Sequence, residues 1–411
     1  MNILMISSTF PYPPSRSGTE VRTFNLLKAL QDKHSISLVA QRSPDVSDRD
    51  VEELKKWVDE LILFPLAADE IPIKGIAGIR VKAGRFLESF SKGIPPNVLH
   101  RYSPEIQALV DRYVAQGKCD AITCEHSANA VYIRPQYCGR VRTIVNVHSS
   151  VYWGRINYLK TGTSENPARD RFYLPILYRY EKNYCDRCDY LAVTTEDDAR
   201  QLQQFNPRAK IVTIPNGVDL ELFPYRSADP GGKNLIFVGS MDLTHNIDAA
   251  RFFVLKVLPK LREIHPEVTY SIVGNRPVPE VSSLAEYPGV VVTGRVPSMV
   301  DSLHQATACI VSLQTGFGIK NKTIEAMAAG IPVIGSDRGL EGLKVDGENT
   351  PLRALRANSV EEYIKAISRV FADPDLRQTL ACNGRQSIEE NYTWESAGQK
   401  YEEILTVGNR E

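Results

Sequence analysis

Residues 2–40 read NILMISSTFPYPPSRSGTEVRTFNLLKALQDKHSISLVA and predict a strand, a loop, a helix and a second strand. The apolar run 2–7 is typical of a buried strand, residues 20–30 have helical spacing, and the β-branched run 36–40 predicts the next strand. A strand, a helix and a strand in this order form a βαβ unit with parallel strands. The chain therefore begins as an α/β protein.

The same alternation continues through the first half of the chain. Helical patterns at 104–115 and 174–184 lie among short apolar runs that predict further strands. These runs are 61–64, 121–124, 143–147, 190–194 and 211–214. Because helical crossovers join parallel strands, we expect a mostly parallel sheet wrapped by helices.

A turn-rich linker at 226–233, with Ser-Ala-Asp-Pro-Gly-Gly at its centre, interrupts this pattern. Strand-like runs then start again at 235–238, 270–273, 290–293, 309–312 and 332–334. We therefore expect two doubly wound domains, over residues 1–225 and 226–385, and a C-terminal helix over 386–411. Within 376–405 the pattern predicts helices joined by a kink near Tyr392-Thr393-Trp394.

The composition limits the classes of function. The 411 residues fit two or three domains, and 49 basic and 49 acidic residues give no net charge that would attract nucleic acid or anionic lipid. A hydrophobic content of 43% is that of a soluble globular protein. Neither a membrane span nor a signal peptide is evident, so we expect a cytoplasmic protein.

The cysteine pattern indicates reduced thiols and no metal site. Seven cysteines are scattered over a long chain, which argues against a disulfide framework. Cys185 and Cys188 form a CxxC pair, but zinc needs a second pair at matching spacing, and Cys119 and Cys124 are distant and spaced differently. We therefore expect no bound metal.

Residues 316–330 read GFGIKNKTIEAMAAG and predict an anion site. Glycines precede a helix whose first turn carries Lys320 and Lys322, so free N–H groups, the positive helix end and two ammonium groups come together. Glu325, one turn into the helix, can accept hydrogen bonds from both hydroxyls of a ribose. Diphosphate plus ribose indicates a nucleotide, and a plain glycine turn before a surface helix is the alternative.

Five segments together resemble the nucleotide-sugar glycosyltransferases of GT-B fold, specifically glycosyltransferase family 4. They are the loop 13–20, Ile-Pro-Asn-Gly-Val-Asp at 214–219, Phe-Val-Gly-Ser-Met-Asp at 237–242 with Asn246 and Asp248, Thr-Gly-Arg-Val at 293–296, and the segment 316–333. The resemblance implies two Rossmann-like domains facing across a cleft, with the last helix crossing back to the first domain.

The resemblance also implies a nucleotide-sugar on the second domain and the acceptor on the first. The base would lie near Gly294, Arg295 and Val296, and the ribose on Glu325. Lys320 and Lys322 would hold the diphosphate as catalytic residues. The other expected donor-binding residues are Gly316, Phe317, Gly318, Ile319, Asn321 and Thr323.

Two segments of the first domain join the implied site. His126, within Cys-Glu-His-Ser-Ala-Asn-Ala at 124–130, resembles a histidine that faces the donor sugar, and His148 is a second candidate. A hydrogen-bonded structural histidine is the alternative for both. In the N-terminal loop, Gly18 and Arg16 would come near the sugar and the diphosphate.

The sequence departs from the family at three positions. Relatives usually carry an Arg where this chain has Ser240, and a Lys where it has His245 or Asn246, and both hold the diphosphate. Many also have a Glu where this chain has Phe317. We expect Lys320 and Lys322 to replace the missing cations.

The resulting hypothesis is a retaining glycosyltransferase of polysaccharide, glycolipid or other glycoconjugate biosynthesis, with no cofactor beyond its nucleotide-sugar substrate. A nucleotide-sugar epimerase of the same fold and a non-catalytic nucleotide-sugar-binding protein are the alternatives. Residues 73–92 mix aliphatic and basic side chains and predict peripheral contact with the inner face of a membrane, near a lipid-linked acceptor. Neither the oligomeric state nor the donor follows from the sequence.

Overall fold

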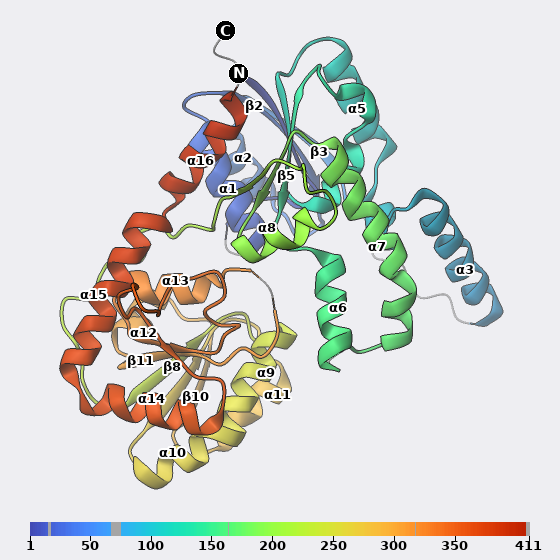
Figure 1. The fold of residues 1–411 in the computed structure, drawn as a ribbon. Coiled ribbons are helices and arrows are strands. Elements are labelled where there is room, and N and C mark those ends of the chain that lie inside the picture. Colours follow the sequence, from blue (N-terminus) through green and yellow to red (C-terminus); the bar gives the residue numbers. More distant parts are fainter. Residues whose placement is uncertain (15–17, 67–74, 163, 317, 408–411) are drawn as a thin grey trace. The chain divides into compact units, whose positions relative to one another are not determined.

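The computed structural model describes residues 1–14, 18–66, 75–162, 164–316 and 318–407, which form two compact units (Figure 1). The first unit is Met1–Pro215 together with Ala397–Glu411, and the second is Asn216–Ser396. The boundaries predicted after residues 225 and 385 both lie within the second unit. Figure 1 shows helices on both faces of each sheet, as in doubly wound α/β domains.

The first unit contains a seven-stranded sheet in the order β3-β2-β1-β4-β5-β6-β7. All neighbouring strands are parallel, which confirms the predicted α/β class. The strands are β1 (Asn2–Ser7), β2 (Ser35–Arg42), β3 (Glu60–Pro65), β4 (Ala121–Cys124), β5 (Arg142–Val147), β6 (Tyr190–Val193) and β7 (Ile211–Thr213).

Side-chain caps begin several helices of the first unit. The Ser103 hydroxyl accepts from the backbone N–H of Ile106, and α5 starts at the next residue, as predicted. One helix begins seven residues before the predicted start at 174 and continues through Pro175. The helices are α1 (Gly18–Leu30), α2 (Asp48–Lys55), α3 (Gly75–Lys92), α4 (Pro96–Arg101), α5 (Pro104–Ala115), η1 (Ser127–Tyr132), η2 (Pro135–Tyr137), α6 (Val151–Thr161), α7 (Pro167–Arg187) and α8 (Glu196–Gln203).

The second unit contains a six-stranded parallel sheet in the order β10-β9-β8-β11-β12-β13. Phe237, Phe253 and Tyr270 are among the fully buried side chains of its core. Five strands match the predicted runs, and β13 was not predicted. The strands are β8 (Asn234–Val238), β9 (Thr269–Val273), β10 (Val290–Gly294), β11 (Ala308–Val311), β12 (Val333–Gly335) and β13 (Leu355–Arg356).

The predicted kink near Tyr392-Thr393-Trp394 separates the last two helices, since α15 ends at Asn391 and α16 begins at Trp394. Val218 pairs with Thr393 in a parallel bridge, which ties this kink to the start of the second unit. The helices after β7 are α9 (Thr244–Phe252), η3 (Phe253–Val257), α10 (Leu258–Ile264), α11 (Pro279–Ser282), η4 (Ser283–Glu286), α12 (Met299–His304), α13 (Asn321–Ala328), α14 (Val360–Ala372), α15 (Pro374–Asn391) and α16 (Trp394–Thr406).

Both sheets reverse their strand order beside the first strand, between β1 and β4 and between β8 and β11. Ligands of doubly wound sheets bind at this reversal, outside the carboxyl ends of the strands. The fold therefore directs attention to the loops after β4, β8, β9 and β11.

Candidate functional site

Helix α13 starts with unpaired backbone N–H groups. Gly316 and Gly318 have φ of 103° and 73°, a backbone conformation that favours glycine. The Lys320 carbonyl accepts from the N–H groups of Thr323 and Ile324, at 2.9 and 3.3 Å. Within the described part of the chain, the N–H groups of Asn321 and Lys322 have no acceptor. Together with the helix dipole, they can bind an anion.

Lys322 lies over the end of β8. Its Nζ donates to Asn246 Oδ1 at 2.5 Å and stands 4.2 Å from the centre of the Phe237 ring. A Cβ on Gly239, whose φ is 153°, would lie 2.8 Å from this Nζ, so only glycine leaves room for the ammonium. Burial lowers the pKa of Lys322 to about 7, although the Glu325 carboxylate acts in the opposite direction.

Glu325 lies one turn into α13, where the sequence predicted it. Burial raises the pKa of its carboxyl to about 7, and the Lys322 ammonium partly offsets this shift. Among the residues that the structure describes, none donates a hydrogen bond to the Glu325 carboxylate. Its oxygens are therefore available to a ligand.

Lys320 is held by other groups of the protein. Its Nζ donates to the Gly318 carbonyl at 2.5 Å and lies 3.2 Å from Glu341 Oε2. The other Glu341 oxygen pairs with Arg338 at 2.7 Å. The Lys320 side chain is only 10% exposed, so an anionic ligand would have to share this ammonium with Glu341.

Three other predicted residues of the loop and helix have structural contacts. Ile319 is buried in the core of the second unit. Asn321 Oδ1 accepts from Asn216 Nδ2 at 3.2 Å, and the Thr323 hydroxyl donates to the Gly339 carbonyl at 2.7 Å. The Thr323 side chain therefore faces the protein interior. Phe317 and Arg16 lie outside the described residues.

The expected base-binding segment follows β10. Gly294 ends this strand with φ of 67°, and its carbonyl accepts from the Gly274 N–H at 3.1 Å. Arg295 is exposed, whereas Val296 packs partly against the core. Gly18, the remaining predicted donor-binding residue, is the first residue of α1, with open space around its Cα.

The loops after β8 and β9 add residues that the sequence analysis did not assign to the site. The Ser240 hydroxyl donates to Asn275 Oδ1 at 2.5 Å and accepts from Arg276 Nη2 at 3.1 Å. Burial, with help from the two nearby lysines, lowers the pKa of His245 to about 4. His245 is therefore neutral at pH 7. A Gly-Asn-Arg sequence directly after a strand was the available signal for Arg276.

His126 begins η1 beyond the carboxyl end of β4 in the first unit. Its Nδ1 accepts from the Ala128 N–H at 3.1 Å, and its ring lies 5.4 Å from that of His148. Burial, with a smaller effect of Arg101, lowers the pKa of His126 to about 4. The neutral ring therefore carries its proton on Nε2 and can donate a hydrogen bond.

A buried polar network lies beside His126. Asn146 Nδ2 donates to Glu125 Oε2 at 2.9 Å and to the Tyr401 hydroxyl at 2.8 Å, while Arg22 donates to Asn146 Oδ1 at 3.2 Å. Burial raises the pKa of Glu125 to about 7 and lowers that of Arg22 to about 10. These contacts join α1, β4, β5 and α16 within the first unit.

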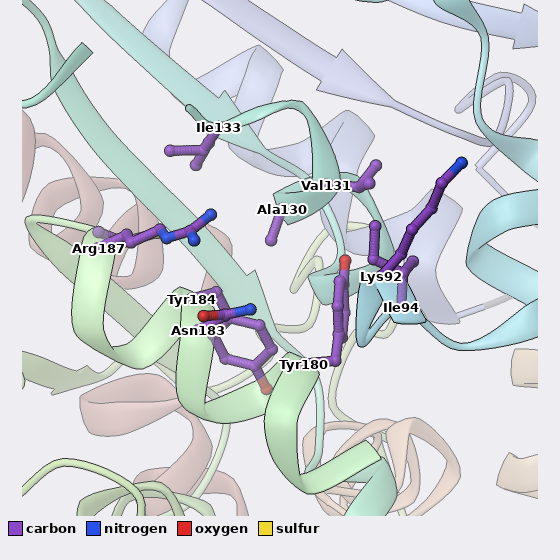
Figure 2. A pocket seen from close by; sticks show the side chains of 10 residues that line it. Lys92, Ile94, Ala130, Val131, Ile133, Tyr180, Asn183, Tyr184 and Arg187 are labelled. Carbon is purple, nitrogen blue, oxygen red and sulfur yellow. The ribbon is translucent and has the colours of Figure 1, made fainter. Parts of the chain in front are cut away.

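A cavity of about 120 Å³ lies between η1 and α7 in the first unit (Figure 2). The Tyr180 hydroxyl donates to the carbonyls of Ser127 and Ala128, the two residues after His126. In Figure 2 the Tyr180 side chain extends toward Ala130 and Val131. The cavity is lined by Lys92, Ile94, Ala130, Val131, Ile133, Tyr180, Asn183, Tyr184, Arg187 and Cys188.

Three further findings concern metals and membranes. In the described ranges, no three His, Cys, Asp or Glu side chains are grouped to hold a metal ion. Cys185 and Cys188 are free thiols, and burial raises the pKa of each. None of the described helices has the length and apolar character needed to span a bilayer.

Comparisons with known proteins define the class. The chain aligns over 98% of its length with sucrose-phosphate synthase from Thermosynechococcus elongatus, covering 98% of that chain, with a TM-score of 0.68 and 19% identity. It aligns over 99% with Anabaena HepE in complex with UDP, covering all of that chain, with a TM-score of 0.66 and 12% identity. The fold is that of the GT-B glycosyltransferases, as predicted.

Two family matches cover most of the sequence. Residues 16–222 match Glycosyltransferase Family 4, and residues 232–373 match the family described as Glycosyl transferases group 1. The chain therefore belongs to glycosyltransferase family 4, which confirms the resemblance found in the sequence.

The chain is also similar in sequence to curated proteins. Glycogen synthase of Mycobacterium tuberculosis is 26% identical over 212 residues, which are 49% of this chain and 50% of the synthase. The matched region thus spans about half the length of that relative. A 44.6 kDa protein of the Klebsiella pneumoniae cps region is 21% identical over 403 residues, covering 95% of this chain and 96% of its own.

Proposed function

We propose that the protein is a retaining glycosyltransferase that moves a sugar from a nucleotide diphosphate-sugar to an acceptor hydroxyl. The observation that carries this proposal is the Glu325 carboxylate, which accepts no hydrogen bond within the described ranges. Burial raises the pKa of this carboxyl to about 7. The Glu325 side chain is half-buried, and a partly desolvated carboxylate without protein donors is a favourable partner for a ligand that carries hydroxyls. The two hydroxyls of a ribose would donate to it.

The diphosphate would bind beside the start of α13. There the Lys322 ammonium lies next to Gly239, and the N–H groups of Asn321 and Lys322, at the start of the same helix, have no acceptor in the described part of the chain. During transfer the bond from the anomeric carbon to the diphosphate breaks and the bond to the acceptor oxygen forms on the same face. The acceptor proton passes to the leaving diphosphate oxygen, whose growing charge these groups stabilise.

His126 is proposed to assist from the first unit. Its Nε2–H can donate to a hydroxyl of a sugar that reaches this unit, because Nδ1 already accepts from Ala128. We also propose that the acceptor binds the first unit. The cavity in Figure 2 has an aromatic and apolar lining that includes Arg187, which suits a sugar that carries an acidic group, whereas the Lys92 ammonium is paired with Glu88 at 2.7 Å.

The relatives guide the choice of substrates. HepE has been solved with UDP and with UDP-glucose, so UDP-sugars are the first donors to test. The Klebsiella relative is named for the cps region, and a Salmonella typhimurium relative is named a lipopolysaccharide N-acetylglucosaminetransferase. Both names favour a carbohydrate or lipid-linked acceptor in polysaccharide or glycolipid synthesis.

A thermal-shift screen of UDP, GDP, ADP and TDP tests the donor class. A nucleotide present at 100 times its Kd should stabilise the protein by about 2.7 kcal/mol. Calorimetry then measures the nucleotide that binds. Glu325→Ala should reduce its binding free energy by about 1.5 to 3 kcal/mol, the range for hydrogen bonds to a charged group. Unchanged affinity in a folded Glu325→Ala variant would refute the ribose assignment.

Incubation with the sugar nucleotide and candidate acceptors then separates the three candidate functions. A glycoside product supports the transferase, an altered free sugar nucleotide would indicate an epimerase, and binding without turnover would indicate a sensor. The anomeric configuration of the product, measured by NMR, tests retention.

Peripheral membrane contact is proposed for the end of α3. Leu87 is 66% exposed, Phe90 is also exposed, and Phe86 stacks on the exposed Phe172 of α7 at 4.2 Å. Lys92 lies near these apolar groups on the same helix. Sedimentation with anionic lipid vesicles should be lost in Leu87→Glu combined with Phe90→Glu, and persistent sedimentation would refute the contact.

A further inference from the structure

The proposed phosphate site contains less positive charge than the sequence suggested. Lys320 is paired with Glu341, and Lys322, with its pKa near 7, is only partly charged at neutral pH. A nucleoside diphosphate carries at least two negative charges on its phosphates. A further cation near the end of β8 would strengthen the binding of such a ligand.

Arg276 lies at this edge of the sheet, in the loop after β9. Its Nη2 donates to the Ser240 hydroxyl at 3.1 Å. The Ser240 carbonyl accepts from Asn246 Nδ2 at 2.8 Å, and Asn246 Oδ1 accepts from Lys322. Ser240 thus lies between the two cations: its hydroxyl accepts from the Arg276 guanidinium, and its carbonyl accepts from the Asn246 amide that also binds the Lys322 ammonium.

The Arg276 guanidinium presents one free edge. Its Nε pairs with Asp242 Oδ2 at 3.1 Å and its Nη2 bonds Ser240, whereas Nη1 has no partner in the described part of the chain. The side chain is 59% exposed. Asp242 and Ser240 therefore orient the guanidinium while its remaining N–H groups stay available to an anion.

The backbone at Arg276 is also unusual. Its φ is 52°, and it is the only residue other than glycine with a positive φ among the described residues. A glycine would adopt this conformation without strain, whereas an arginine does so at a cost in free energy. An arginine at a position that favours glycine indicates that its side chain has a functional role.

We infer that Arg276 is a donor-binding residue whose guanidinium contacts the diphosphate of the nucleotide-sugar. It supplies from β9 the cation that relatives place after β8, where this chain has Ser240. The inference rests on the proposed function. Arg276 would contact the phosphates of the nucleotide and neither its base nor its ribose.

The test compares wild-type protein with Arg276→Gly, since glycine suits the local φ and should keep or raise the Tm. Affinities for the nucleoside diphosphate found in the thermal-shift screen, and for its nucleoside, are measured by competition NMR. We expect Arg276→Gly to lose about 10- to 100-fold in affinity for the diphosphate and less than twofold for the nucleoside. Arg369→Ala, which removes an exposed arginine from α14, is the control and should change neither.

Two further variants sharpen the test. Asp242→Asn keeps an oxygen that can accept from Arg276 Nε but removes a negative charge beside the guanidinium, and it should raise diphosphate affinity severalfold. Ser240→Arg combined with Arg276→Gly should recover part of the lost affinity.

Unchanged diphosphate affinity in Arg276→Gly, or an equal loss of affinity for the nucleoside, would overturn the assignment of Arg276 but leave the proposed function intact. If wild-type protein binds none of UDP, GDP, ADP and TDP, the proposed function itself fails, and the inference fails with it.

Discussion

The surroundings of Lys322 lower the pKa of its ammonium to about 7, so its charge can change near neutral pH. Asn246 and the face of the Phe237 ring hold it over the end of β8, and the missing Cβ of Gly239 leaves room for it. A bound diphosphate would raise its pKa and keep it charged. The residue is therefore suited to respond to the charge of the ligand.

We expect Lys322→Ala to reduce turnover by about 10²- to 10³-fold, the scale for losing one donor that stabilises a leaving group. Binding should weaken less than turnover, because negative charge on the diphosphate grows in the transition state. Adding Ser240→Arg should restore part of the rate. Steady-state kinetics measure both, with the exposed Lys365→Ala as control. Normal turnover in Lys322→Ala would show that backbone N–H groups bind the phosphates by themselves.

Lys322 and Glu325 should also make donor binding depend on pH. The Lys322 ammonium, with a pKa of about 7, is charged below pH 7, while the Glu325 carboxylate, also with a pKa of about 7, is charged above it. His245, with a pKa of about 4, stays neutral over this range. Nucleotide affinity should therefore be greatest near pH 7 and fall on both sides.

Calorimetry from pH 5.5 to 9 checks this dependence. Glu325→Gln should remove the fall on the acidic side, and Lys322→Met should remove the fall on the alkaline side. An affinity that is flat across this range in wild-type protein would contradict the assignment of both groups.

Among the elements, α16 contributes a buried hydroxyl to the first unit. Tyr401 accepts from Asn146 and donates to Glu125 at 3.3 Å, so Tyr401→Phe removes a donor from the buried Glu125 carboxylate and one of the two acceptors of the buried Asn146 amide. We expect a loss of about 1 to 3 kcal/mol in the free energy of unfolding, measured in urea. Tyr270→Phe is the matched control, because the buried Tyr270 hydroxyl has no partner within the described ranges. A loss of equal size in both variants would show that the network adds nothing.

The strands were predictable because each is a short apolar run that ends near a glycine or a polar residue. β13 was missed because it has only two residues, Leu355 and Arg356, too few to show a pattern. The helix through Pro175 starts earlier than predicted because proline is an unreliable sign of a helix boundary when it lies inside a long helix.

The site was predictable where its residues follow one another in the sequence. Lys322 and Glu325 share a helix, so spacing alone placed them together. The pairing of Lys320 with Glu341 was not predictable, because Glu341 belongs to a loop 21 residues further on. The contact of Arg276 with Ser240 depends on the pairing of β8 with β9, which no local pattern reveals.

For the whole molecule, we expect turnover that needs no divalent metal. Within the described residues no three His, Cys, Asp or Glu side chains are grouped to hold a metal ion, and Lys322 and backbone N–H groups can neutralise the charge of a diphosphate. Turnover measured in excess chelator should stay within about twofold of the untreated rate. Activity that disappears in chelator and returns with Mg²⁺ or Mn²⁺ would contradict this expectation.

The order of the two units along the chain has a practical consequence for dissecting the enzyme. The first unit is interrupted after Pro215 and resumes at Ala397, so the second unit is an insertion within it. Every residue assigned to nucleotide binding on α13 and on the loops after β8, β9 and β10 lies within this inserted segment. Residues 216–396, expressed alone, should therefore bind the nucleotide with most of the affinity of the full chain but transfer no sugar. Calorimetry and a turnover assay on this fragment would measure the two properties.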